Sequence, residues 1–156
     1  MLEEKLDYCV VNSPENMQYL SSFQAITYSR PIVFVIDHET THLIIPAIEE
    51  KHAHLESTGV KHLHVYYEHP EMAQNAASVI DCLKKILKPN TRVGAEFRSA
   101  SLSFVKAIES MNIKIYNISE LLVKMRYIKE EIEKNYIREA GRLCQYAFKK
   151  SLEYAH

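Results

Sequence analysis

Two apolar runs lie only four residues apart in this chain, and this spacing limits most strongly the folds that the sequence can adopt. Residues 31–36 read PIVFVI and residues 41–45 read THLII, so both are typical of strands. The short connection leaves no room for a helix and therefore predicts an antiparallel hairpin. The other strand candidates are separated by helical patterns, so this hairpin must join a sheet that is otherwise built from strand–helix units.

Four further segments predict strands, and amphipathic helices alternate with them. The strands are expected at residues 7–11, 62–67, 91–96 and 113–116, and the helices at residues 14–21, 46–58, 70–87, 99–111 and from 119 onward. Ser13 and Pro14 form a favoured helix start, and Gly59 is a typical helix end. Together these patterns predict an α/β fold with a mixed sheet of about six strands flanked by helices.

The last part of the chain is a single helical pattern from residue 129 to the end. Its apolar stripe comprises Ile132, Tyr136, Ala140, Leu143, Ala147 and Phe148. The stripe is unfinished at His156, so we expect the rest of a larger protein to follow. Large apolar side chains in such a stripe need a covering surface. We therefore expect this helix to pack on the α/β domain or on a second copy of the chain.

Composition and charge exclude several classes of protein. The formal net charge is −1 and no basic stripe is present, so a nucleic-acid partner is not expected. The longest apolar run is far shorter than the roughly 20 residues that span a membrane, and the N-terminus does not read as a signal peptide. The cysteines, Cys9, Cys82 and Cys144, are odd in number and widely spaced. We expect them to be reduced and mostly buried in a cytoplasmic protein.

Residues 38–42 read HETTH and match the zinc signature H-E-x-x-H. That signature works on a helix, where the two histidines share one face and both reach the ion. Here the motif falls in the predicted hairpin, so we interpret it as a chance match. His62 and His64 are two apart on a predicted strand and share a face. A two-histidine metal site and a packed strand face both remain open for this pair.

No assembled catalytic machinery is apparent in the sequence. The three glycines exclude a glycine-rich phosphate loop, and no serine or cysteine has a nucleophile signature such as G-x-S-x-G. We therefore expect no catalytic residue, no metal site and no cofactor in this chain, which by itself is predicted to be inactive.

Four segments, read in order, resemble one protein family. Residues 12–23 (NSPENMQYLSSF) are similar to the segment SPxNxxYLSGF of the creatinase/prolidase/aminopeptidase P family, with Ser22 where that family often has glycine. Residues 29–31 (SRP) lead into the apolar strand as in the family, and residues 43–49 (LIIPAIE) resemble its next segment. Residues 122–140 (LVKMRYIKEEIEKNYIREA) are similar to the junction at which the family's second domain begins. The resemblance covers essentially the whole chain.

This resemblance implies a domain division and a function. Residues 1–125 would form the α/β N-terminal domain, and residues 126–156 a linker and the first helix of a truncated "pita-bread" catalytic domain. The parent would be a metal-dependent Xaa-Pro dipeptidase or aminopeptidase, in which this non-catalytic domain shapes the active-site mouth and the homodimer interface. The same domain of a creatinase-type amidinohydrolase or related small-molecule hydrolase is one alternative, and a stand-alone binding or dimerisation module is another.

The resemblance also implies where metal and substrate would bind. In the family two Asp, one His and two Glu hold two divalent metal ions (Mn, Co or Zn), and all of them lie in the second domain. In creatinase-like members an aromatic-x-Arg sequence before the strand reaches the partner's active site and contacts a substrate carboxylate. Tyr28 and Arg30 match this pattern, with Tyr in place of Phe. A structural ion pair is the alternative role for Arg30.

Overall fold

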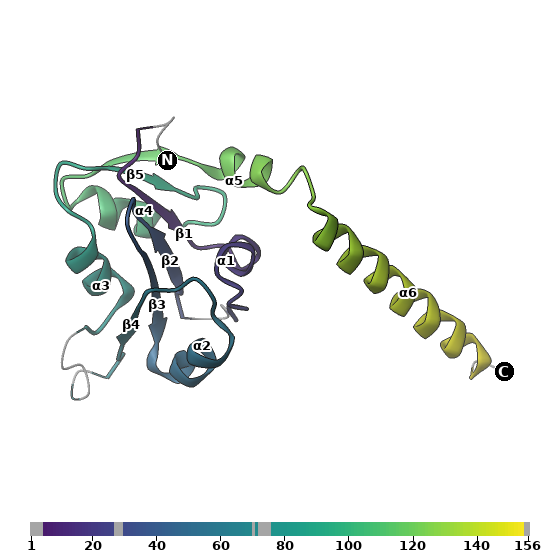
Figure 1. Cartoon of the computed structure of the whole chain (residues 1–156). Coiled ribbons are helices and arrows are strands. Elements are labelled where there is room, and N and C mark those ends of the chain that lie inside the picture. Colours follow the sequence, from purple (N-terminus) through teal and green to yellow (C-terminus); the bar gives the residue numbers. More distant parts are fainter. Residues whose placement is uncertain (1–4, 27–29, 70, 72–75, 155–156) are drawn as a thin grey trace. The chain divides into compact units, whose positions relative to one another are not determined.

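The computed structural model describes residues 5–26, 30–69, 71 and 76–154. The chain divides into two compact units, Met1–Glu120 and Leu121–His156 (Figure 1). The first unit contains the sheet and the pocket discussed below. The second consists mostly of one long helix.

The first unit is built on a six-stranded mixed sheet with the strand order β4-β3-β2-β1-β5-β6. β2 is antiparallel to both of its neighbours, β1 and β3, whereas the pairs β3–β4, β1–β5 and β5–β6 are parallel. The predicted hairpin, the α/β class and the six-stranded mixed sheet are thus confirmed. The strands are β1 (Tyr8–Val11), β2 (Val33–Ile36), β3 (Thr41–Pro46), β4 (His62–Tyr66), β5 (Arg92–Ala95) and β6 (Lys114–Asn117).

Helices cover both faces of the sheet, as Figure 1 shows. One face packs against α3 (Val79–Ile86) and α4 (Leu102–Glu109). The other faces α1 (Pro14–Ser21) and α2 (Glu50–Glu56). Because successive side chains of a strand point to opposite faces, a strand covered on both sides reads as a continuous apolar run. The fully buried residues of β1 and β2 have this pattern.

The helix predicted over residues 70–87 is wrong at its start. Residues 70 and 72–75 lie outside the described residues, but α3 begins only at Val79. Ser78 is extended and caps α3: its Oγ accepts a hydrogen bond from the N–H of Asp81 at 3.2 Å and donates one to Asp81 Oδ2 at 2.9 Å. The carbonyl of Ala76 accepts a hydrogen bond from the N–H of Tyr67. These bonds compete with helix formation before residue 79.

Two other helices have ends that the sequence did not define fully. The helix predicted over residues 46–58 is a short 3-10 turn, Ala47–Glu49, followed by α2. α1 ends at Ser22, which has the left-handed backbone conformation with φ 59°. Thr58 fastens this end, because its N–H donates to the carbonyl of Ser21 and its hydroxyl donates to Ser22 Oγ, both at 2.7 Å.

The second unit contains the long helix α6 (Glu131–Glu153), while α5 (Ser119–Met125) spans the boundary between the units. Glu130 and Glu133 form a capping box at the start of α6. None of the residues of α6 is buried, and the exposed side chains include Ile132, Tyr136, Leu143 and Phe148.

Cys9 and Cys82 are buried as expected, whereas Cys144 on α6 is exposed, which corrects the expectation for that residue.

Within the described part of the chain, no helix combines the length and the apolar character that crossing a membrane requires.

Gly94 in β5 allows two core side chains to approach the sheet closely. A Cβ at this position would lie 2.5 Å from Cγ2 of Ile118 and 2.8 Å from Cδ1 of Leu6, and both of these residues are buried. We expect Gly94→Ala to lower the free energy of unfolding by about 1–3 kcal/mol through overpacking, as measured by urea denaturation. Gly141→Ala is the matched control, because its Cβ would meet no atom within 4 Å. This change should stabilise α6 by up to about 1 kcal/mol. Equal effects of the two changes would contradict the close-approach explanation.

Candidate functional site

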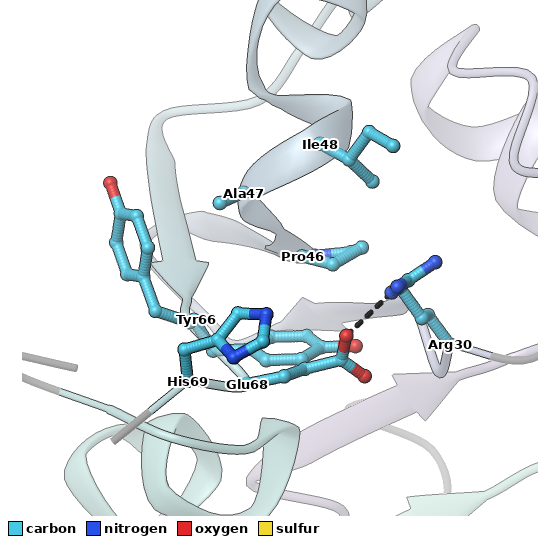
Figure 2. Close-up of a pocket in the computed structure, with 8 residues that line it drawn as sticks. Arg30, Pro46, Ala47, Ile48, Tyr66, Glu68 and His69 are labelled. Carbon is cyan, nitrogen blue, oxygen red and sulfur yellow. Dashed lines mark hydrogen bonds and ion pairs between the residues drawn. The ribbon is translucent and has the colours of Figure 1, made fainter. Parts of the chain in front are cut away.

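A pocket of about 190 Å³ opens at the carboxyl ends of the parallel strands β3 and β4. Figure 2 shows the side chains that line it. In α/β sheets this edge is where ligands usually bind, because the loops that follow parallel strands meet there. The lining residues are Arg30, Pro46, Ala47, Ile48, Tyr66, Tyr67, Glu68 and His69.

An ion pair crosses this pocket. Nε of Arg30 lies 2.6 Å from Oε2 of Glu68, and each side chain is 45% exposed (Figure 2). The hydrogen bond from Arg30 to Glu68 and their opposite charges raise the pKa of the guanidinium, which is therefore permanently charged. Because the ion pair is open to water, its strength is modest and another carboxylate can compete for it. The bond to Glu68 uses Nε, so the terminal nitrogens of the guanidinium can approach a second anion.

Tyr66 fixes the segment that carries the arginine. Its hydroxyl donates a hydrogen bond to the carbonyl of Pro31 at 3.0 Å, directly after Arg30. Burial raises the pKa of Tyr66 to about 12, and the carboxylate of Glu68 contributes in the same direction. The phenol therefore stays protonated near neutral pH and keeps its role as donor. The proline itself holds the residue before it in an extended conformation.

The structure places one of the two predicted site residues in this pocket. Arg30 lines it, whereas Tyr28 lies outside the described residues. The sequence reasoning did not identify Glu68 and Tyr66, which the structure brings to Arg30 from the end of β4. An acidic residue directly after a predicted strand was the signal that the sequence offered for Glu68. Its position beside Arg30 depends on the parallel pairing of β3 with β4, which the sequence does not show.

The HETTH segment does not form a metal-binding helix. His38 lies in the connection between β2 and β3, and His42 lies within β3, as predicted. Among the residues that the structure describes, no group of three or more His, Cys, Asp or Glu side chains is arranged to hold a metal ion.

A second polar cluster lies at the carboxyl ends of β1 and β5. Glu96 is only 4% exposed. Its Oε2 accepts hydrogen bonds from the backbone N–H groups of Asn12 at 3.4 Å and Ser13 at 3.0 Å, and its Oε1 accepts one from Asn16 Nδ2 at 2.5 Å. These three hydrogen bonds hold the buried carboxylate in place, so Glu96 fixes the turn between β1 and α1.

Solved structures share this fold. The proline dipeptidase from Streptococcus pneumoniae TIGR4 has a TM-score of 0.67 at 22% identity, over 82% of this chain and 92% of that chain. The prolidase from Pyrococcus horikoshii OT3 has a TM-score of 0.76 at 20% identity, over 98% of this chain and 40% of that chain. The X-Pro aminopeptidase from Thermotoga maritima MSB8 has a TM-score of 0.75 at 21% identity, over 97% and 42% of the two chains.

The architecture is therefore that of the α/β domain found in prolidases and X-Pro aminopeptidases. Residues 1–128 match the Creatinase/Prolidase N-terminal domain, and the chain belongs to that family. A search among curated proteins gives no significant match. The family predicted from four short segments is thus confirmed.

The Glu96 cluster makes a stability prediction. Glu96→Gln places an amide N–H₂ group against donors that now face a carboxylate, and it removes the charge from three hydrogen bonds. We expect the free energy of unfolding to fall by about 1–3 kcal/mol, measured by urea denaturation. Glu120→Gln is the control, because Glu120 forms an exposed ion pair with Arg98 and its loss should cost about 0–1 kcal/mol. A Glu96→Gln protein as stable as the control would contradict the assigned role.

Proposed function

We propose that this chain is the non-catalytic N-terminal domain of a metal-dependent Xaa-Pro dipeptidase or aminopeptidase. In the parent enzyme it shapes the mouth of the active site and contributes to a homodimer interface, with no nucleic-acid or membrane partner. The observation that carries this proposal is the placement of Arg30, a family-pattern arginine, in a pocket at the carboxyl ends of two parallel strands. The family membership and the fold shared with prolidases support it.

Two of the similar proteins are longer than this chain, which supports a separate catalytic domain in the parent enzyme. This chain spans 40% of the Pyrococcus horikoshii prolidase and 42% of the Thermotoga maritima aminopeptidase. We propose that residues 1–125 are the N-terminal domain and that residues 126–156 lead into the catalytic domain. The exposed apolar residues of α6 would then be covered by that domain. The enzyme would be cytoplasmic, in keeping with the free cysteines.

The two divalent metal ions (Mn, Co or Zn) would belong to the catalytic domain and not to this chain. Such a pair supplies an activated water and polarises the scissile carbonyl. The contribution of this chain is recognition of the substrate. In the dimer, Arg30 would bind a substrate carboxylate at the partner's active site, and Tyr28 would help to shape the same opening.

Glu68 competes with the substrate carboxylate for Arg30. In the free domain the Arg30 guanidinium is paired with Glu68. An incoming carboxylate either displaces Glu68 or binds the terminal nitrogens beside it, and two parallel hydrogen bonds favour the planar carboxylate of a peptide. Because creatine also carries a carboxylate, a creatinase-type hydrolase remains the alternative that substrate assays must separate.

The first test concerns activity. The longer protein encoded by the gene, purified with Mn²⁺ or Co²⁺, should release proline from Xaa-Pro dipeptides, whereas residues 1–156 alone should not. Creatine and cyclic amidines serve as alternative substrates in the same assay. Hydrolysis of creatine in place of dipeptides would favour the amidinohydrolase. A gene that ends at residue 156 would favour the stand-alone dimerisation module.

The second test concerns Arg30 in the longer protein. Arg30→Ala and Arg30→Lys should each raise KM for the dipeptide about tenfold with the dimer intact, because neither can form two parallel hydrogen bonds. Tyr28→Phe should have a smaller effect. Glu68→Gln is the matched control: it breaks the same ion pair but removes the competing carboxylate, so KM should stay equal or fall. If Glu68→Gln raised KM as much as Arg30→Ala, or if both Arg30 variants were unchanged, Arg30 would have only a structural role.

A further inference from the structure

Three histidines gather at the start of β3 and β4, at the opposite end of these strands from the pocket. His42 is paired in register with His62, and His64 follows two residues later on β4, so all three side chains leave the sheet on one face. The rings of His42 and His62 are stacked with centroids 5.0 Å apart, and those of His42 and His64 are 5.2 Å apart. These three residues are termed the histidine cluster below.

A hydrogen bond joins two members of the histidine cluster across the strands. Nδ1 of His42 lies 3.0 Å from Nε2 of His64, and Oδ2 of Asp37 lies 3.5 Å from Nε2 of His42. The carboxylate favours a proton on Nε2 of His42, which leaves Nδ1 to accept the N–H of His64. One added proton can reside on the other nitrogen of His64 without loss of this bond. Protonation of both rings places two N–H groups against each other and removes the bond.

The surroundings of the pair disfavour these added protons. Burial lowers the pKa of His42, and the positive charge of a protonated His62 acts in the same direction, whereas Asp37 opposes both. Burial also lowers the pKa of His64, together with His42, His62 and Lys85 on α3. Charged or titratable groups from the turn before β3, from β4 and from α3 thus act on the pair. Asp37 is the negative group that partly balances these positive charges.

β4 is an edge strand whose neighbour in the sheet is β3. The histidine cluster adds a side-chain connection to the backbone ladder at the amino-terminal end of that edge. We propose that the histidine cluster is a proton-operated latch: while His42 and His64 are neutral their hydrogen bond fastens the start of β4 to β3, and when both rings take up a proton in acid the bond is lost and the edge strand frays.

The direction of the pH effect follows from the lowered pKa values. An opened strand exposes both histidines to water, where the pKa of imidazole is about 6.5. The open form therefore binds more protons than the closed form between the lowered values and about pH 6.5, and the closed form loses stability as the pH falls through this window. His52 acts in the opposite sense, because Glu49 and Glu56 raise its pKa. Its contribution is complete below about pH 6.5 and is lost as the pH rises, so it stabilises the fold more at about pH 5.5 than at about pH 7.5 and cannot produce the expected loss in acid.

Amide hydrogen exchange of the 156-residue chain measures the latch directly. The measured quantity is the ratio of the protection factors of residues 62–66 to those of β1, each corrected for intrinsic exchange rates. This ratio is compared at about pH 7.5 and about pH 5.5. A chelator is present throughout, because clustered histidines can take up transition metals. In the wild type we expect this ratio to fall about tenfold, because both histidines bind protons more readily in the opened strand than in the closed one. In His64→Gln, whose amide can still donate to His42 but does not titrate, the fall should be less than about threefold.

His54→Gln is the matched control, because His54 is exposed on α2 away from the cluster, and it should behave as the wild type. An unchanged ratio in the wild type, or an equal fall in His64→Gln, would overturn the proposal. Ring-nitrogen NMR of the wild type gives a second measurement that needs no variant. Linked titration of His42 and His64 below about pH 6.5 supports the latch, whereas independent titration at ordinary values refutes it.

Discussion

The buried carboxylate of Glu96 fixes how the two halves of the sheet meet. It follows β5 and accepts hydrogen bonds from three donors in residues 12–16, directly after β1. β1 lies between the antiparallel hairpin and the parallel strands β5 and β6, so the turn that leaves β1 must be held in a single conformation. An unpaired carboxylate at this depth would cost several kcal/mol. Glu96 therefore ties the end of β5 to the turn that follows β1, at the centre of the sheet.

Periodicity along the sequence predicted most of the fold, because strands buried on both faces and capped helices leave local signatures. Ser13 and the hairpin spacing are signals of this kind, and the structure confirms them. The start of α3 was not predictable, because Ser78 could equally sit within a helix until its hydrogen bonds to Asp81 are known. The pairing of Arg30 with Glu68 and of His42 with His64 depends on strand register, which no local pattern contains. For this reason the arginine was identified and its partners were not.

β4 has different chemistry at its two ends. Its carboxyl end supplies Tyr66 and leads to Glu68, which hold the segment around Arg30. Its amino end carries His62 and His64 beside His42. A single edge strand thus connects a titratable cluster to the wall of the candidate pocket. Any loosening that begins at the histidines has a path of only a few residues to the group that competes for the arginine.

Ser22 shows how a substitution within a family can change the balance of local forces. Its left-handed backbone costs a residue with a Cβ about 1 kcal/mol or more relative to glycine, which gives a physical reason for the glycine that the family often has there. The serine hydroxyl, however, accepts a hydrogen bond from Thr58, in the loop that follows α2. In this chain the hydrogen bond between the two loops offsets part of the backbone cost at position 22 and ties the end of α1 to the loop after α2.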